Sequence, residues 1–320
     1  MKAAIFTQYG APEVIQIVDT EKPSPKPDEV LVKIEASSVT RADTMIRQGV
    51  PKFGRLFLGL IKPKNKALGT GFSGVVEAVG SQVTKFRIGS VVFGEKLFSE
   101  GSNAEYLCMS EDLVIAHKPK SISHSEAAPI CDGFLTSYNF LKDIAKIKSG
   151  QHVLVNGASG SLGSAAIQLA KIMGAKVTGV SSAKNIDFVL ALGADEVLDY
   201  TKVKLDELSC TYDVVYDTVG KLSYKTFKTL IGSNGLFMTP VLNGEVLWHM
   251  LWRPNKVKFA ATGVKKTKEL KRLFEELVQF FEQGKLHTNI DNTFKLSEIK
   301  YAHQYVETGR KVGNIVIKNS

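Results

Sequence analysis

The stretch Val153–Ala170, VLVNGASGSLGSAAIQLA, decides the fold of the second half of the chain. An apolar strand ends at Asn156, Gly157, Gly160 and Gly163 follow at three-residue spacing, and an apolar helix comes next. One glycine permits the sharp turn, the next lets the backbone approach a pyrophosphate, and the last lets helix and strand pack closely. The helix N-terminus offers N–H groups to phosphates. Packing alone also produces glycine turns, but this context favours a dinucleotide site.

Strands and helices alternate around this stretch, which predicts βαβ units and a parallel sheet with both faces buried. The expected strands are His152–Val155, Val177–Val180, Glu196–Leu198, Val214–Tyr216 and Leu236–Met238, and the expected helices are Leu162–Met173 and Asn185–Leu192.

The first 120 residues have a different character, with short strands and turns such as Val30–Ala36 and Val75–Val79 and one short helix, Thr40–Gln48. A helix that Gly133 could interrupt is expected over Ser123–Leu141. The end of the chain predicts a long amphipathic helix, Lys266–Gln283, and a final strand, Asn314–Ile317.

The end of the second strand of the expected parallel sheet indicates which dinucleotide binds. An NAD site usually places Asp or Glu there to bind the ribose 2′-hydroxyl. Here Ser181 and Ser182 occupy this place and Lys184 follows. Hydroxyls and an ammonium suit a 2′-phosphate, so the sequence predicts NADPH rather than NADH. A solvated lysine at a helix start is the alternative for Lys184.

Composition fits an ordinary globular protein, because hydrophobic residues make up 44% and charged residues 23% of the 320 residues, and it excludes disorder and coiled coil. The net charge of +9 raises nucleic acid or a membrane surface as possible partners.

No apolar run approaches the roughly 18 residues of a spanning helix, and the strand-like N-terminus argues against a signal peptide. Three distant cysteines, Cys108, Cys131 and Cys210, give no disulfide framework, so a cytoplasmic location is expected.

Several segments in order resemble one family: MKAAIFTQYGAPEVIQI, DEVLVKIEASSVTRADTMIRQG, GFSGVVEAVGSQVTKFRIGSVVFG, FLTSYNFLKD, the glycine stretch, LGADEVLDY, YDVVYDTVG and GRKVGNIVIK. Together they resemble the medium-chain dehydrogenase/reductase superfamily, in the branch of zinc-independent NADPH:quinone oxidoreductases and alkenal and enone reductases. The resemblance implies an α/β protein with two domains. A GroES-like β-barrel catalytic domain would span 1–122, completed by 262–320, and a Rossmann doubly wound parallel sheet would span 123–261, with the active site in the cleft between them.

The resemblance also argues against a metal. Zinc-dependent relatives have a cysteine where this chain has Asp43 and a Gly-His-Glu where it has Gly69-Thr70-Gly71. Cys131 lies near a further ligand position, but one thiol does not make a site that needs three protein ligands. No metal is therefore expected.

Without a metal Lewis acid, the expected reaction is hydride transfer from NADPH to a quinone or to the β-carbon of an α,β-unsaturated carbonyl. One alternative is a sensor or scaffold that binds NADPH without turnover. Another is an RNA-binding relative of the quinone oxidoreductases. Lysines cluster at Lys265–Arg272 and at Lys62, Lys64 and Lys66, but no RNP-like aromatic motif accompanies them, so nucleic acid is not favoured.

By resemblance, the catalytic candidates are Thr40, Asp43, Arg47 and Thr136. The alternatives are a helix cap for Asp43, a solvated side chain for Arg47 and a helix-start hydroxyl for Thr136. The cofactor-binding candidates are Gly157, Ser159, Gly160, Ser161, Leu162, Gly163, Ser181, Ser182, Lys184, Tyr200, Thr218, Val219, Gly220 and Asn314. The segment Lys52–Lys66 is either a substrate lid or a surface loop. A homodimer could form through the expected strand Val257–Ala261.

Overall fold

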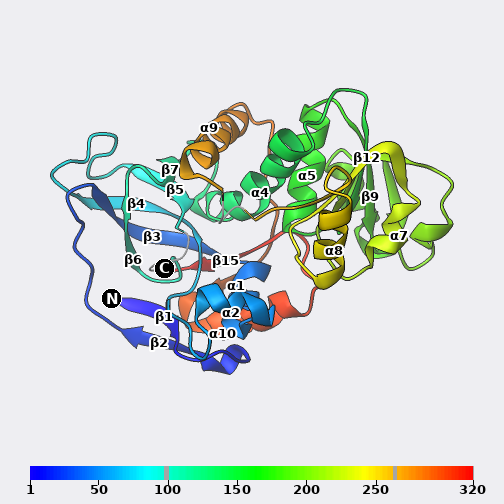
Figure 1. Ribbon diagram of the computed structural model, residues 1–320. Helices are drawn as coiled ribbons and strands as arrows, with labels where there is room; N and C mark the ends of the chain where they lie inside the picture. Colours follow the sequence, from blue (N-terminus) through cyan, green and yellow to red (C-terminus); the bar gives the residue numbers. More distant parts are fainter. Residues whose placement is uncertain (97–100, 262–264, 320) are drawn as a thin grey trace. The chain divides into compact units, whose positions relative to one another are not determined.

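A computed structural model describes residues 1–96, 101–261 and 265–319 (Figure 1). The chain forms two compact units, one made of Met1–Asp132 with Lys266–Ser320 and the other of Gly133–Lys265. The domain limits expected from the sequence fall after residues 122 and 261, and residues 262–264 lie outside the described residues.

Within the described residues, the first unit contains a seven-stranded sheet and a separate two-stranded ribbon. The sheet has the order β14-β15-β3-β4-β5-β7, with β6 paired to β3. Its strands are β3 (Glu29–Val39), β4 (Gly71–Val79), β5 (Val91–Glu95), β6 (Tyr106–Ser110), β7 (Val114–His117), β14 (Ile290–Lys295) and β15 (Asn314–Lys318), and the ribbon pairs β1 (Lys2–Phe6) with β2 (Ile15–Asp19). The last strand, β15, pairs with β14 and with β3, so residues from the first third and from the end of the chain form one sheet.

The first unit also contains helices, which connect or follow its strands along the chain. They are α1 (Arg41–Gln48), α2 (Arg55–Leu58), α3 (His124–Ala127), α9 (Thr267–Glu282) and α10 (Ile299–Glu307), with short 3-10 turns η1 (Pro12–Val14), η2 (Lys52–Gly54) and η8 (Leu296–Glu298). Helix α9 packs on β7, and α10 packs on β3, β14 and β15.

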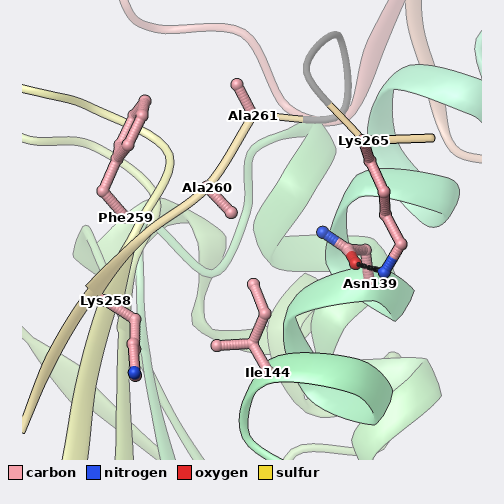
Figure 2. Close-up of a pocket in the computed structure, with 7 residues that line it drawn as sticks. All are labelled: Asn139, Ile144, Lys258, Phe259, Ala260, Ala261 and Lys265. Atoms are coloured by element: carbon pink, nitrogen blue, oxygen red, sulfur yellow. Dashed lines mark hydrogen bonds between the residues drawn. The ribbon is translucent and has the colours of Figure 1, made fainter. Parts of the chain in front are cut away.

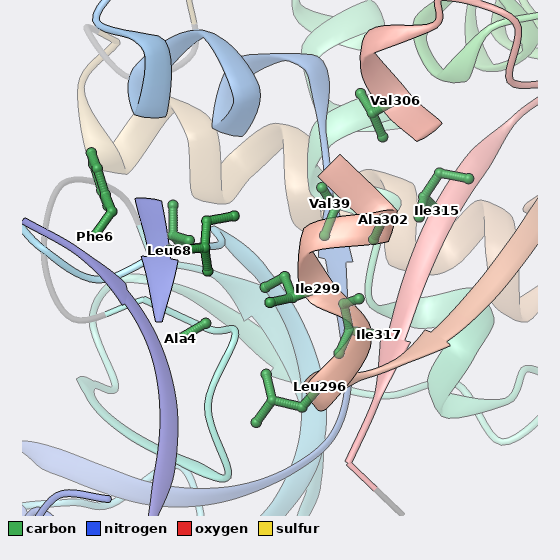
Figure 3. Packing of buried hydrophobic residues seen from close by; sticks show 11 residues of the cluster. Ala4, Phe6, Val39, Leu68, Leu296, Ile299, Ala302, Val306, Ile315 and Ile317 are labelled. Carbon is green, nitrogen blue, oxygen red and sulfur yellow. The ribbon is translucent and has the colours of Figure 1, made fainter. Parts of the chain in front are cut away.

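One core of the first unit joins residues from both ends of the chain (Figure 3). Phe6 of β1, Val39 at the end of β3, Ile299 of α10 and Ile315 of β15 are all at most 2% exposed. Burial of such side chains stabilises the fold by about 1.5–3 kcal/mol each. The N-terminal and C-terminal segments therefore depend on each other for their stability.

The second unit contains a six-stranded parallel sheet of order β10-β9-β8-β11-β12-β13. Its strands are β8 (His152–Asn156), β9 (Lys176–Ser181), β10 (Glu196–Asp199), β11 (Tyr212–Asp217), β12 (Ile231–Thr239) and β13 (Val257–Phe259). Its helices are α5 (Ser161–Ile172), α6 (Ile186–Ala191), α7 (Tyr224–Lys228) and α8 (Gly244–Trp252), with 3-10 turns η5 (Ala183–Asn185) and η6 (Leu205–Glu207). The parallel sheet expected from the alternating pattern is confirmed.

The segment expected as one helix over Ser123–Leu141 is more complex. After α3, the chain forms a π-helical turn η3 (Cys131–Leu135), a short α4 (Thr136–Tyr138) and a second π-helical turn η4 (Asn139–Ile144). Gly133 does not break the helix. It lies inside η3, where a Cβ atom would come within 3.0 Å of the Ser161 carbonyl oxygen at the start of α5.

Candidate functional site

The glycine loop joins β8 to α5 in the second unit, and its three glycines differ in their surroundings. Gly157 has φ +80°, and a Cβ there would come within 2.5 Å of Val219 Cγ2. A Cβ at Gly163 would lie 2.1 Å from the Gly157 carbonyl oxygen. At Gly160 the nearest atom is that same oxygen, 3.5 Å away. Gly157 therefore makes the turn and Gly163 the close packing, while the face at Gly160 is open.

The N-terminus of α5 begins at this open face. Gly160 is the N-cap residue, and no side chain makes a capping hydrogen bond there. The first turn consists of Ser161, Leu162 and Gly163, all predicted to bind the cofactor. A helix N-terminus without a capping side chain carries N–H groups and a partial positive charge suited to an anion. The geometry therefore fits a phosphate group.

Ser159 connects the glycine loop to the end of β9. The Ser181 hydroxyl donates to Ser159 Oγ at 3.2 Å, and Asn185 Nδ2 donates to the same oxygen at 3.0 Å. Ser181 is buried, whereas Ser182 is half-buried and Lys184 is exposed in η5. Ser182 and Lys184 are thus the groups that face solvent at this strand end. The exposure of Lys184 is equally compatible with a solvated lysine.

The loop after β11 is organised by a buried carboxylate. Asp217 is 1% exposed and accepts hydrogen bonds from Asn156 Nδ2 at 2.8 Å, Val219 N at 3.0 Å and Gly220 N at 3.2 Å. Burial raises its pKa, and the hydrogen bond from Asn156 opposes that shift. The Thr218 hydroxyl donates to the Asn156 carbonyl at 2.7 Å. These bonds hold the predicted residues Thr218, Val219 and Gly220 beside the glycine loop.

Strands β8 and β11 are neighbours, while the chain leaves β8 toward β9 on its other side. Ligands of such sheets bind outside the carboxyl ends of the strands at this switch point. Asn156 and Asp217, which end these two strands, were not among the predicted site residues. Their signal in the sequence is a polar residue that closes an apolar strand, in VLVN and DVVYD.

Two other predicted cofactor residues have different surroundings. Tyr200, just after β10, is 59% exposed, and its backbone N–H donates to the Ser181 carbonyl at 3.1 Å. Asn314 belongs to the first unit, is 4% exposed, and its Nδ2 donates to the Asn289 carbonyl at 3.0 Å. Its amide side chain thus helps to hold the start of β15.

The start of α1 holds two of the predicted catalytic residues. The Thr40 hydroxyl accepts from Asp43 N at 3.1 Å, and Asp43 Oδ2 accepts from Thr40 N at 2.7 Å, which is a capping box. The expected alternative, that Asp43 caps this helix, is confirmed. Burial raises the pKa of Asp43 to about 6, although the hydrogen bonds from Thr40 oppose this.

Arg47 is fully buried, so the alternative of a solvated side chain is wrong. Its guanidinium donates to the Gly10 carbonyl and to Glu307, and its Nε donates to His303 Nδ1 at 3.4 Å. Burial lowers the pKa of His303 to about 3, so the imidazole stays neutral and accepts this hydrogen bond. These hydrogen bonds link the Arg47 guanidinium on α1 to His303 and Glu307 on α10 and to the Gly10 carbonyl.

Thr136, the remaining catalytic candidate, is 8% exposed. Leu135 before it is also helical, with φ −65° and ψ −40°. The alternative of a helix-start hydroxyl is therefore wrong, because Thr136 lies inside a continuous helical run.

A group of buried acids near Asp43 was not predicted from the sequence. Glu95, which ends β5, lies opposite Gly71 of β4 in the antiparallel register. It is 6% exposed, and its Oε2 is without a hydrogen-bond partner among the described residues. Burial, together with Asp132 and Asp43, raises the pKa of Glu95 to about 8. Burial also raises the pKa of the Cys131 thiol. The first unit thus holds a carboxyl group that keeps its proton at neutral pH.

A cavity of about 190 Å³ in the first unit has Asp43 in its wall. The rest of its lining is Tyr9, Ile46, Phe57, Leu58, Lys96 and parts of the loop from Pro63 to Thr70. The Lys96 ammonium donates to the Cys108 carbonyl. This cavity brings a predicted catalytic residue together with five residues of the predicted lid, Phe57, Leu58, Pro63, Lys64 and Asn65.

A second cavity, of about 310 Å³, lies in the second unit beside β13 (Figure 2). Its wall includes Lys258, Phe259, Ile144 and Lys265, and the Lys265 ammonium donates to Asn139 Oδ1 at 2.7 Å. None of the predicted site residues lines it.

The residues at the zinc-ligand positions do not suit that metal. Asp43 is engaged with Thr40, Thr70 offers only a hydroxyl, and Cys131 is a buried thiol whose pKa is raised. In the part of the chain that the structure describes, no group of three or more His, Cys, Asp or Glu side chains is placed to hold a metal ion. The side chains at these positions therefore do not fit a zinc ion.

Known proteins match the two halves of the chain separately and together. The family model of the alcohol dehydrogenase GroES-like domain matches residues 26–120, and that of a zinc-binding dehydrogenase matches residues 192–317. A 2-methylene-furan-3-one reductase of Solanum lycopersicum is 34% identical over 331 residues, which cover 99% of this chain and 79% of the relative. An NADPH-dependent alkenal/one oxidoreductase, chloroplastic, of Arabidopsis thaliana is 31% identical over 99% of this chain and 79% of the relative.

The fold agrees with these matches. The quinone oxidoreductase from Coxiella burnetii superposes with a TM-score of 0.87 and 31% identity, over 100% of this chain and 99% of that chain. A GroES-like domain and a dinucleotide-binding sheet define the class of NAD(P)H-dependent dehydrogenases and reductases. Within that class, the chain belongs to the medium-chain dehydrogenase/reductase superfamily, in the branch of the quinone oxidoreductases and the alkenal and enone reductases.

Proposed function

We propose that this protein transfers a hydride from NADPH to a quinone or to an α,β-unsaturated carbonyl compound, without zinc. The observation that carries the proposal is the open face at Gly160, where α5 starts without a capping side chain beside the switch point of the sheet. The names of the relatives, which include a quinone oxidoreductase and an alkenal/one oxidoreductase, support the substrate class.

The residues of the second unit have distinct roles in this proposal. The first turn of α5, with Ser161, Leu162 and Gly163, binds the pyrophosphate, and Ser182 with Lys184 binds the 2′-phosphate. Asp217 fixes the Thr218–Gly220 loop through its hydrogen bonds, so that this loop meets the ribose. The bound NADPH supplies the hydride from its nicotinamide ring. The remaining candidates are Ser159 and Ser181, which shape the loop, and Tyr200 and Asn314, which contact the cofactor at its ends.

The first unit supplies the substrate side. Thr40 and Asp43 are the residues proposed to meet the substrate carbonyl, and Thr136 is the residue proposed to meet the nicotinamide. Arg47 acts indirectly, because its guanidinium holds α1 through Gly10 and Glu307. An electrophilic substrate is required, since these residues give no metal Lewis acid to polarise a simple alcohol or ketone.

The decisive experiment is stopped-flow oxidation of bound NADPH with 1,4-benzoquinone, followed by a panel of enals and enones. We expect rapid oxidation with at least one class, unchanged by a chelator and in protein free of zinc by elemental analysis. Tight NADPH binding without oxidation by any acceptor would favour the sensor or scaffold instead. Activity that disappears with the chelator would overturn zinc independence.

The specificity for NADPH over NADH rests on Ser182 and Lys184 and on the absence of an acid at the end of β9. The name of the Arabidopsis relative supports it. Tighter binding of NADH than of NADPH in a fluorescence titration would contradict this choice.

The functional domains are proposed as residues 1–122 with 262–320 for catalysis and 123–261 for the dinucleotide. We also propose a homodimer through β13, because it is one of the two edge strands of the parallel sheet formed by the described residues, and an edge strand can pair with a second copy. Light scattering on the full chain tests the dimer, and a monomer at all concentrations would exclude it.

A cytoplasmic location is proposed because Cys108, Cys131 and Cys210 are all free thiols, which suits a reducing compartment. Among the described residues, no helix has the length and apolarity needed to cross a membrane. Cell fractionation tests the location, and recovery in an organelle, as the name of the chloroplastic relative suggests for that protein, would contradict it.

A further inference from the structure

The segment from Phe53 to Ile61 in the first unit, here called the apolar loop, presents large hydrophobic side chains to solvent. Five of them are exposed, at 50% for Phe53, 64% for Leu56, 81% for Phe57, 66% for Leu60 and 86% for Ile61. Singly exposed hydrophobic residues are common, but a run of this kind within nine residues marks an interaction surface.

The apolar loop has a defined conformation that points these side chains outward. Tyr9 donates its hydroxyl hydrogen to the Gly59 carbonyl at 2.7 Å, and Arg55 Nε donates to the Gly49 carbonyl at 2.9 Å. The backbone N–H of Lys64 donates to the Leu58 carbonyl at 2.8 Å. The turn is closed at Gly59, whose φ of +120° favours glycine. The hydrophobic side chains are thus presented by a formed turn that the first unit holds in place.

Exposed cations surround the apolar loop. Lys52 precedes it, and Lys62, Lys64 and Lys66 follow it, all four exposed. The sequence has no Asp or Glu between Thr44 and Val76. The surface therefore combines a hydrophobic tip with a rim of one charge sign.

We propose that the apolar loop docks on the surface of a bilayer that contains anionic phospholipids. Hydrophobic side chains enter the boundary between headgroups and acyl chains, while lysine ammonium groups meet lipid phosphates. This attachment is interfacial, so it needs no spanning helix. Because Phe57 and Leu58 also line the cavity that holds Asp43, docking brings that cavity next to the lipid.

Two other occupants fit the surface less well. In a symmetric dimer the same patch would face itself, and the lysines would then oppose each other across the contact. An RNA strand would pair with the lysines but would leave Leu60 and Ile61 in water. Of these three occupants, the anionic membrane satisfies both the charged and the hydrophobic parts.

Docking is tested by flotation of the full chain with vesicles of phosphatidylcholine alone and of phosphatidylcholine mixed equally with phosphatidylglycerol. We expect binding to the mixed vesicles, little binding to the neutral ones, and weakening as salt rises. The result does not depend on the proposed reductase activity, because no cofactor or acceptor is present.

Two double variants separate the hydrophobic and the charged parts, and neither changes a residue of the cavity wall. Leu60→Ser with Ile61→Ser is expected to lower vesicle affinity at least about tenfold, because both side chains lose contact with the lipid. Lys62→Gln with Lys66→Gln is expected to lower it about 25-fold, at about fivefold for each lysine. All four side chains are exposed, so circular dichroism and the Tm should stay unchanged.

Ile88→Ser is the matched control, because Ile88 is 67% exposed but lies outside the apolar loop, and its vesicle binding should equal that of the unchanged protein. Leu251→Ser with Trp252→Ser tests the other exposed hydrophobic face, on α8, where these residues are each 70% exposed. This variant should also bind vesicles normally.

The proposal is overturned if the unchanged protein ignores the mixed vesicles, or if only the α8 variant loses binding. A dimer that dissociates in the Leu60/Ile61 variant, with no vesicle binding, would assign the apolar loop to a second copy of the chain. Binding of a single-stranded oligonucleotide that only the Lys62/Lys66 variant loses, again with no vesicle binding, would assign the lysines to nucleic acid.

Discussion

Two buried carboxyl groups, each at the carboxyl end of a strand, differ in how the protein treats their charge. Asp217 ends β11 in the second unit and accepts hydrogen bonds from one side-chain amide and two backbone N–H groups. Glu95 ends β5 in the first unit and has an oxygen with no partner within the described ranges. Burial raises the pKa of both carboxyl groups, but only Asp217 has hydrogen bonds that oppose this shift.

The difference separates a structural carboxylate from a titratable one. Asp217 holds the Thr218–Gly220 loop, because its oxygens accept hydrogen bonds from that loop and from Asn156. Glu95 lies near Asp43 and Asp132, which act with burial to raise its pKa to about 8. Buried groups with shifted pKa values often occur at functional sites. The Asp217 loop of the second unit is therefore held by hydrogen bonds, and the first unit contains a carboxyl group that can gain or lose a proton near neutral pH.

The largest effect is expected from removal of the structural carboxylate. Asp217→Ala leaves Asn156 Nδ2 and two backbone N–H groups without an acceptor, which should cost about 2–4 kcal/mol of unfolding free energy. NADPH affinity should fall at least about tenfold because the Thr218–Gly220 loop loses its anchor. Denaturant unfolding and fluorescence titration measure both. Asp206→Ala, at an exposed position, is the control. Normal stability and normal NADPH affinity in the Asp217 variant would contradict the structural role of this carboxylate.

The raised pKa of Glu95 should make the free energy of unfolding depend on pH. In the folded protein its pKa is raised to about 8 from the usual 4.5, so the stability it gives is fully present below pH 4.5 and is lost as pH rises through about 8. Relative to Glu95→Gln, the unchanged protein should lose about 2 kcal/mol between about pH 6 and about pH 8. Denaturant unfolding across this range measures the difference.

Glu111→Gln provides the matched control for Glu95. Burial acts to raise the pKa of Glu111, but the backbone N–H groups of Lys85 and Thr84 outweigh it and hold the pKa below its usual range. Its contribution is present above the unfolded pKa and is lost only in acid, so its variant should differ by a constant amount between about pH 6 and about pH 8. Parallel curves for both variants would refute the protonated state of Glu95.

Gly160 and Gly163 test whether the open face is a binding surface. Gly160→Ala places its Cβ 3.5 Å from the Gly157 carbonyl oxygen, an ordinary van der Waals contact. The Tm should therefore stay unchanged, while NADPH affinity falls about tenfold because the methyl group meets the pyrophosphate. Gly163→Ala should instead lower the stability by about 1–3 kcal/mol, since its Cβ lies 2.1 Å from a carbonyl oxygen. Full NADPH affinity in the Gly160 variant would place the pyrophosphate elsewhere.

The smallest effect concerns cofactor choice. Lys184→Glu should weaken NADPH about tenfold and leave NADH nearly unchanged, because only NADPH carries the 2′-phosphate. Lys176→Glu, at the opposite end of β9, should change neither affinity. An equal loss of both cofactors in the Lys184 variant would indicate a structural role for this residue.

The glycine loop could be predicted from the sequence because its signal is local. Spacing, the strand before it and the helix after it all lie within Val153–Ala170. The parallel sheet followed from the same alternation. The π-helical turns η3 and η4 could not be predicted in this way. Their segment contacts residues distant in sequence: Gly133 of η3 approaches Ser161, and the Ser137 hydroxyl of α4 donates to the Leu162 carbonyl.

The buried acids could not be predicted, because their environment depends on strand register and distant segments. Glu95 faces its neighbours only because β5 pairs with β4 so that it lies opposite Gly71. Asn156 meets Asp217 across 61 residues of chain. Arg47 is buried because Glu307, 260 residues later, accepts its guanidinium N–H. A charged residue in a sequence gives no sign of such partners.

The position of β15 determines the order in which the chain can fold during synthesis. The second unit, Gly133–Lys265, is continuous and has all its strands once those residues have left the ribosome. The first unit must wait for Asn314–Lys318, because β15 lies between β14 and β3 in its sheet. Until then, the Ala36–Val39 part of β3 has one unpaired edge, which makes the nascent first unit the aggregation-prone part of the molecule. A chain that stops before Asn314 would thus keep a folded second unit joined to an incomplete first unit.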